Sequence, residues 1–103
     1  MRQIIVRYQV LAAKADTNAA LIEAMVSELE RAQLDGIRYE VFRHPDNWFT
    51  HIFEARDEEA AAAFGSVPAV RAFQESVKDR CAIPPEVSPA QLLGYLNRRG
   101  ASR

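Results

Sequence analysis

The chain contains two histidines, and one of them lies in a segment with the alternation of a β-strand. His51 has Phe49 and Phe53 two positions away on either side, so the three side chains are expected on one face of that strand. Partial desolvation by aromatic neighbours would keep the imidazole neutral, and a neutral imidazole can act as a general base toward a phenol. The alternative is a buried structural histidine with hydrogen-bonded nitrogens. His44, next to Pro45 in a predicted turn, is expected to be solvated.

Four aromatic residues that also carry a polar group are candidates for binding a substrate: Tyr8, Tyr39, Trp48 and Tyr95. A tyrosine hydroxyl can donate a hydrogen bond to a phenolate or a carbonyl oxygen. For the tyrosines, the alternative is a core ring whose hydroxyl reaches a polar rim. Trp48 falls on the strand face opposite His51, and its alternative role is packing in a core or a dimer interface.

Other chemistries have little support in the pattern of residues. The single cysteine, Cys81, has no CxxC partner, no adjacent histidine and no metal-ligand spacing. The sequence has neither of the usual glycine-rich phosphate-binding motifs. We therefore predict that the protein uses neither a metal ion nor a cofactor.

Length and charge limit the classes of protein to consider. The 103 residues include 13 basic and 14 acidic side chains, for a net charge of −1, so no basic surface for nucleic acid or anionic lipid is expected. The longest apolar run is far short of the roughly 20 residues that cross a bilayer, and the apolar stretch before Arg7 is too short for a signal peptide. We expect a cytoplasmic protein with one domain over residues 1–97 and a polar tail over 98–103.

The elements that must position these side chains follow from alternation, helical spacing and turn residues. Strands are predicted over 3–12, 37–43 and 48–55, the last two joined as a hairpin through the turn 44–47. A helix is predicted from a cap at Asp16 or Thr17 to Asp35-Gly36, and two more follow over 57–65 and 66–80, with Ser66 as the cap of the second.

The proline-rich segment 81–90 is predicted to be an extended linker, and 91–97 the last strand. The resulting order, βαββαβ, predicts an α+β, ferredoxin-like fold with a four-stranded antiparallel sheet and helices on one face. The strands carry large apolar groups on both faces, for example Tyr39 and Phe42. An uncovered apolar face of that size favours a homodimer formed sheet to sheet about a twofold axis.

Three segments resemble the antibiotic biosynthesis monooxygenase-like family of dimeric α/β barrels. Residues 36–43 have the pattern Gly-x-x-Tyr-x-x-Phe-Arg, and after the turn the strand 48–54 contains phenylalanine and ends in glutamate. Residues 68–73, Pro-Ala-Val-Arg-Ala-Phe, are similar to the closing helix of the family. The resemblance implies a dimeric α/β barrel with a small-molecule pocket between the sheet and the helices of each subunit.

The resemblance implies two functions, which stay open at this point. One is a cofactor-independent monooxygenase acting on phenolic or quinol-type molecules, with His51 as base and tyrosine hydroxyls stabilising the substrate anion. The other is a non-catalytic dimeric barrel that binds a small ligand or serves a stress-related role. Many enzymes of the family carry histidines near the positions of 61–69, where this chain has none, and this favours the second function. The lack of any histidine after His51 also argues against the haem-degrading branch.

Overall fold

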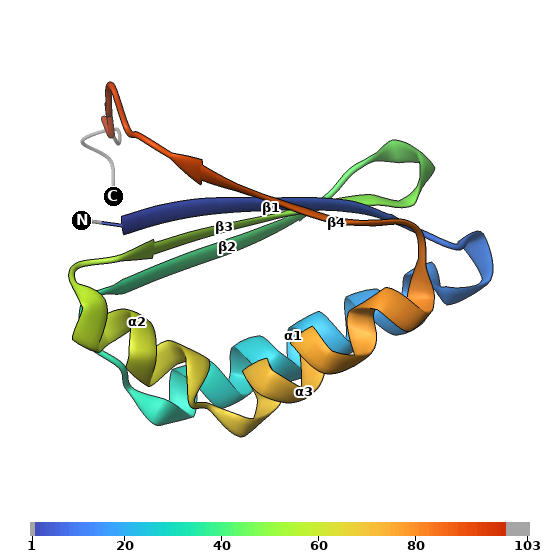
Figure 1. Cartoon of the computed structure of the whole chain (residues 1–103), viewed down its shortest axis with the longest axis horizontal. Coiled ribbons are helices and arrows are strands. Elements are labelled where there is room, and N and C mark those ends of the chain that lie inside the picture. Colours follow the sequence, from blue (N-terminus) through green and yellow to red (C-terminus); the bar gives the residue numbers. More distant parts are fainter. Residues whose placement is uncertain (1, 99–103) are drawn as a thin grey trace.

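Within residues 2–98, which the computed structural model describes, the elements follow one another in ferredoxin-like order. The strands are β1 (Arg2–Val10), β2 (Ile37–Arg43), β3 (Trp48–Ala55) and β4 (Cys81–Ala90); the α-helices are α1 (Ala15–Ala32), α2 (Glu58–Gly65) and α3 (Pro68–Ser76). Short 3-10 turns occupy Ala12–Lys14, Pro45–Asn47 and Val77–Arg80. The strands pair antiparallel in the order β2-β3-β1-β4 (Figure 1). The predicted α+β, ferredoxin-like fold is confirmed, as an open sheet and not a closed barrel.

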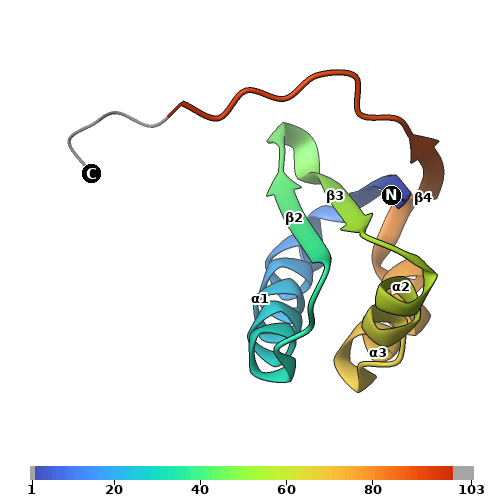
Figure 2. The same ribbon diagram turned by 90° about the vertical axis from the view of Figure 1, so that its left-hand side faces the viewer.

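The sheet has an inner face, covered by the three α-helices, and an outer face on the opposite side (Figures 1 and 2). Because side chains alternate along a strand, Tyr8 and Val10 of β1 point inward together with Phe49 of β3. These three side chains are at most 2% exposed, and they pack in one cluster with Met25 of α1 and Val70 of α3. The core therefore lies between the inner face and the helices.

Helix α1 buries one stripe, and the stripe contains a polar residue. Asn18, Ile22 and Met25 follow one another at helical spacing and are all buried. The predicted cap at Asp16 or Thr17 is wrong, because the helix already begins at Ala15, which is itself buried. No helix within residues 2–98 is long and apolar enough to span a membrane.

Helix α1 also ends earlier than the glycine signal predicted. Gln33, not Gly36, takes the left-handed conformation at the helix end, with φ of 50°. Gly36 has φ of 73° in the loop before β2, where a Cβ atom would lie 2.9 Å from Cζ of Arg56. Glycine is therefore needed there for the entry into β2, both for its backbone conformation and for the close approach of Arg56.

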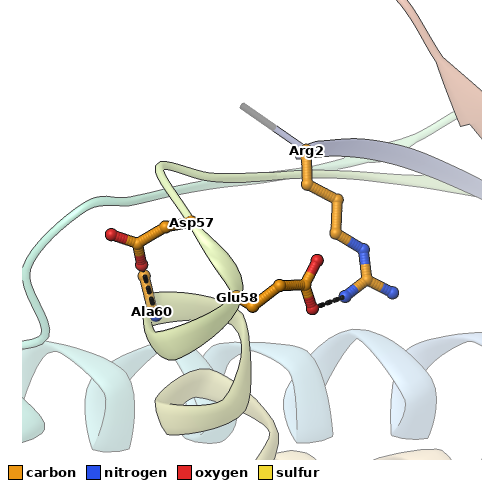
Figure 3. Close-up of polar contacts among 4 residues, drawn as sticks. All are labelled: Arg2, Asp57, Glu58 and Ala60. Atoms are coloured by element: carbon orange, nitrogen blue, oxygen red, sulfur yellow. Dashed lines mark hydrogen bonds and ion pairs between the residues drawn. The ribbon is translucent and has the colours of Figure 1, made fainter.

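Helix α2 begins at the end of β3 and is joined to β1 by an ion pair. The Asp57 carboxylate accepts a hydrogen bond from the backbone N–H of Ala60 at 2.8 Å, and Arg2 lies 3.2 Å from the Glu58 carboxylate (Figure 3). The acidic start of this helix is thus confirmed. Ser66 does not cap α3 as predicted; it ends α2, and its hydroxyl donates to the carbonyl of Ala63.

The prediction for the last strand is wrong. The proline-rich segment is not a linker but β4, and residues 91–98 have no regular secondary structure. The prolines fit because β4 lies at the edge of the sheet, and Pro84 and Pro85 fall at a shift in its register with β1. Edge strands and bulges tolerate residues without a backbone N–H.

Residues 91–98 continue from β4 along the outer side of the sheet (Figures 1 and 2). Their large apolar side chains are exposed, Leu93 by 89% and Leu96 by 81%. Of the predicted tail, only Arg98 is described, and 99–103 lie outside the described residues.

Candidate functional site

A cavity of about 490 Å³ lies between the inner face of the sheet and the helices. The side chains of Tyr8, Tyr39 and His51 form a polar patch in its wall, and exposed Arg2 and Lys78 border it. The rest of the wall is mostly apolar and comes from β1, β3, β4 and the three helices, including Ile4, Val6, Phe53, Phe64, Val70 and Phe73.

The register of the sheet brings both tyrosines to His51. On β1, Tyr8 pairs with Phe49, two residues before His51 on β3. On the other side of β3, Tyr39 of β2 pairs with Phe53, two residues after His51. Diagonal neighbours on one face are within reach of long aromatic side chains. The two hydroxyls therefore approach the imidazole from opposite sides.

Both ring nitrogens of His51 are engaged. The Tyr8 hydroxyl lies 2.7 Å from Nε2, and the Tyr39 hydroxyl lies 2.6 Å from Nδ1. The ring is 6% exposed, and its centroid lies 5.5 Å from that of Phe73. The predicted base is thus in the cavity wall, but with hydroxyls against both of its nitrogens.

All three groups are neutral at pH 7, and burial moves the pKa of each further away from 7. Desolvation lowers the pKa of His51 to about 4, because the charged imidazolium is disfavoured away from water. Desolvation also raises the pKa of Tyr8 to about 12, against a smaller opposing effect of the hydrogen bond from Asn18. It raises the pKa of Tyr39 further, with a smaller contribution from nearby Tyr8.

Two buried polar residues extend this cluster away from the cavity. The amide nitrogen of Asn18 donates to the Tyr8 hydroxyl at 3.0 Å, and Nε of Arg80 donates to the Asn18 carbonyl oxygen at 2.9 Å. Arg80 also donates to the Ser76 hydroxyl at 2.9 Å, and its guanidinium carbon lies 5.2 Å from the centre of the Phe73 ring. Neither Asn18 nor Arg80 was among the site residues predicted from the sequence.

A signal for Asn18 was present in the sequence, whereas none pointed to Arg80. Asn18 occupies the helical stripe that continues with Ile22 and Met25, and a polar residue in such a stripe is expected to have a buried partner. Arg80 lies in the 3-10 turn Val77–Arg80, where the sequence predicted only a basic helix end. Its contact with α1 spans 62 positions, which a local pattern does not show.

The other two predicted binding residues lie outside the cavity. Trp48 is on the outer face, where the Arg7 guanidinium lies 4.1 Å from the centre of its ring. Tyr95 is 62% exposed in the segment after β4, near Arg38 of β2. His44 lies in the hairpin, with its Nε2 atom 2.8 Å from the Thr50 hydroxyl. Among residues 2–98, no group of three potential metal-ligating side chains is found.

Comparison with known proteins finds likeness in structure but not in sequence. No family model and no curated protein matches the chain. Rv0793 from Mycobacterium tuberculosis superposes with a TM-score of 0.77 at 17% identity, covering 93% of this chain and 98% of that one.

Two candidate antibiotic biosynthesis monooxygenases are also similar. The one from Nitrosomonas europaea has a TM-score of 0.71 at 21% identity, covering 91% of this chain and 100% of that one. The one from Caulobacter crescentus has a TM-score of 0.75 at 14% identity, covering 90% of each chain. The chain thus has the fold of antibiotic biosynthesis monooxygenase-like proteins, as the resemblance of residues 36–54 and 68–73 predicted.

Proposed function

We propose that the cavity binds a phenolic or quinol-type small molecule and supports its oxygenation without a metal or an organic cofactor. The observation that carries the proposal is the pairing of an apolar cavity with one polar patch, the two tyrosine hydroxyls on His51. The volume of about 490 Å³ is within the range of small-molecule sites, about 300–1,000 Å³. Apolar walls would hold the rings, and the patch would orient the oxygen substituent.

The reaction balances with oxygen as the only co-reactant. A reduced substrate whose reacting carbon carries two hydrogens gives up four electrons to O₂ in all, and its two hydrogens leave in the water. One atom of O₂ enters the product as a carbonyl oxygen, and the other leaves as water. Ionisation of the substrate makes it electron-rich enough to react, so a hydrogen bond from a tyrosine to the substrate oxygen supports the step by stabilising the anion. Other examples of this fold include proteins described as antibiotic biosynthesis monooxygenases, which agrees with this class of reaction.

Oxygen uptake with a panel of hydroquinones and polyphenols tests the proposal. Ala61 of α2 lines the cavity, and Ala61→Trp should fill it and remove both binding and turnover. Ala62 is the matched control, because it lies on the same helix but is exposed and outside the cavity. Equal turnover in wild type and Ala61→Trp would place the reaction elsewhere.

The alternative function is a non-catalytic protein that binds a small ligand in the same cavity. It is favoured by one observation, that both nitrogens of His51 already have partners within the chain. Binding of panel members that Ala61→Trp abolishes, without oxygen uptake by wild type, would support this alternative.

We also propose that the protein is a homodimer formed through the outer face. Ile5, Trp48 and Ile52 alternate with inward residues on the two central strands, and Phe42 on β2 is 46% exposed. The segment 91–98 adds exposed leucines on the same side of the sheet. A second copy is the occupant that would cover both, and two outer faces related by a twofold axis would form the dimeric barrel.

A further inference from the structure

The hydrogen bonds around His51 form a relay of five side chains that runs from the 3-10 turn Val77–Arg80 to the cavity. In order, the members are Arg80, Asn18, Tyr8, His51 and Tyr39, with successive polar atoms 2.9, 3.0, 2.7 and 2.6 Å apart. Four of the five are buried, and Tyr39 at the end lines the cavity. The direction of hydrogen-bond donation along this relay decides whether a ligand in the cavity meets a donor or an acceptor.

The orientation of the Asn18 amide is fixed from the Arg80 end. A guanidinium has N–H donors and no acceptor, so the Asn18 atom that faces Nε must be the carbonyl oxygen. The amide nitrogen then faces Tyr8, and the Tyr8 oxygen accepts its hydrogen bond. The assignment of oxygen and nitrogen in this amide therefore follows from chemistry.

A count of protons fixes the other two bonds. Neutral His51 has one ring N–H, and each of the two tyrosines has one hydroxyl proton. Three protons are thus available for two contacts, so one proton must point out of the cluster. The pKa of His51, lowered to about 4 by burial, agrees with a neutral ring at pH 7.

The outward proton cannot belong to Tyr8 without cost. The Tyr8 oxygen already accepts from Asn18, the residue is 1% exposed, and no further acceptor for its proton is found within residues 2–98. Buried hydroxyl protons are rarely left without an acceptor. The Tyr8 proton therefore goes to Nε2 of His51, the ring proton sits on Nδ1 and is donated to Tyr39, and the Tyr39 proton faces the cavity.

We infer that Arg80 and Asn18 are positioning residues that hold His51 as the Nδ1–H tautomer and leave Tyr39 as a hydrogen-bond donor to the ligand. The inference rests on the proposed function and deepens it, because it names the ligand atom as an acceptor oxygen, a phenolate or a quinone carbonyl. Lys78 at the border of the cavity carries the charge sign that suits an anion, whereas the charge of Arg2 there is paired with Glu58. His51 then supports Tyr39, and the substrate enters as an anion without giving its proton to the imidazole.

Nitrogen-15 NMR of the histidine rings in ligand-free protein tests the tautomer directly, since protonated and unprotonated ring nitrogens have widely separated shifts. His44→Gln removes the signals of the other ring and so assigns those of His51. We expect a protonated Nδ1 and an unprotonated Nε2. A ring protonated on Nε2, or an even mixture of the two forms, would overturn the inference.

Asn18→Asp should reverse the direction of hydrogen-bond donation between Tyr8, His51 and Tyr39, with almost no change in the shape of the side chain. Arg80 still donates to one carboxylate oxygen, and the other oxygen now accepts the Tyr8 proton. Tyr8 must then accept from Nε2–H, so the tautomer switches. An unchanged Nδ1–H ring in folded Asn18→Asp contradicts the relay. If that variant does not fold, Tyr39→Phe replaces it: there the ring should stay Nδ1–H, because Tyr8 still donates to Nε2, and a switch contradicts the relay.

Binding of para-nitrophenol tests the consequence for the ligand, because its phenol and phenolate forms differ in colour. Wild type should bind the phenolate in preference and lower the pKa of the bound probe. Tyr39→Phe and Asn18→Asp should each weaken phenolate binding about tenfold or more, the usual cost of a lost hydrogen bond to a charged group. Equal phenolate affinity in wild type and Tyr39→Phe would overturn the donor role of Tyr39. If wild type does not bind the probe, the cavity site of the proposed function fails for phenolates, whereas the tautomer in ligand-free protein still decides the relay.

Discussion

The two faces of the sheet differ in how far a single chain pairs their polar groups and buries their apolar side chains. On the inner face, most polar groups are held in a connected set, and His51 has a partner at each nitrogen. Within residues 2–98, one buried nitrogen, Nη2 of Arg80, has no hydrogen-bond partner. On the outer face, Phe42 and the leucines of 91–98 remain open to solvent. The outer face thus exposes apolar side chains that a second surface could cover. In the proposed dimer, each chain would hold its own site on the inner face, and the outer face would form the contact between copies.

Matched pairs of residues make this contrast measurable. His51 on the inner face is buried between two hydroxyls, whereas His44 in the hairpin is exposed. Arg80 and Arg7 both lie over an aromatic ring, but Arg80 is 7% exposed and Arg7 is on the open outer face. Each pair allows the same substitution to be compared on the two sides of the molecule.

The largest effect is expected for His51→Gln on turnover. Loss of the imidazole removes the partner that orients Tyr39 as a donor to the substrate anion. Oxygen uptake should fall by about 10²–10³-fold, the usual range for loss of one positioned donor to an anion in the transition state. His44→Gln should keep wild-type turnover, and circular dichroism should show both variants folded. Turnover of His51→Gln within about threefold of wild type would make His51 a structural residue only.

The second prediction is a dependence of stability on pH that comes from His51. Its pKa falls from the ordinary 6.5 to about 4 on folding, so the unfolded chain binds the proton more readily between these values. The free energy of unfolding therefore has its full value, as far as His51 is concerned, above pH 6.5. It decreases by about 3 kcal/mol in all as the pH falls toward 4. The groups nearest to the ring, Tyr8 and Tyr39, stay neutral throughout this range.

Urea unfolding of wild type, His44→Gln and His51→Gln across this range checks the pH dependence. Wild type and His44→Gln should lose stability in parallel on acidification. His51→Gln should show a much flatter dependence, because the titrating ring is gone. Parallel curves for all three proteins would show that other groups cause the loss.

The third prediction concerns the outer face. Ile52→Lys places a charge at the centre of the proposed interface and should weaken the dimer about 30-fold or more, which corresponds to about 2 kcal/mol. Val26→Lys, on the helical side of the molecule, is the control and should leave the association unchanged. Sedimentation equilibrium measures both. A wild-type mass of 11.6 kDa at micromolar concentration would exclude the dimer.

The smallest effect compares the two arginines by urea unfolding. Arg80→Lys loses the Nε donor to Asn18 and the contact with Ser76, and should cost about 1–3 kcal/mol of stability. Arg7→Lys, exposed over Trp48, should change stability by no more than about 0.5 kcal/mol. Equal losses in the free energy of unfolding for the two substitutions would show that the burial of Arg80 does not make it more important for stability than Arg7.

Most of the fold and the centre of the site could be predicted from local patterns. Strand alternation grouped His51 with Phe49 and Phe53 on one face of β3 and put Trp48 on the other, but it did not tell which face points inward. What it could not supply was register, and register alone makes both tyrosines diagonal neighbours of His51. The relay escaped prediction because the contact of Arg80 with Asn18 depends on how a 3-10 turn packs against α1.

The position of the last strand was predicted wrongly for a similar reason, because local patterns do not show which segments pair in the fold. A run containing Pro84, Pro85 and Pro89 looks unsuited to a sheet, because proline does not donate to the ladder. Leu92, Leu93, Tyr95 and Leu96 look better suited to a strand, yet they lie exposed. The pattern of residues reports on propensity, while the pairing of β4 with β1 depends on its position at the sheet edge.

The prolines of β4 also limit how copies of the chain can join. A free sheet edge usually offers a row of N–H and C=O groups on which another strand can grow, and this is a common start of fibrous aggregation. Three of the ten residues of β4 have no N–H to offer, and its register is interrupted beside two of them. An incoming strand would find gaps in its ladder, so continuous growth from this edge is blocked. The prolines of β4 therefore disfavour one route to uncontrolled polymerisation and leave the outer face as the surface for the proposed dimer.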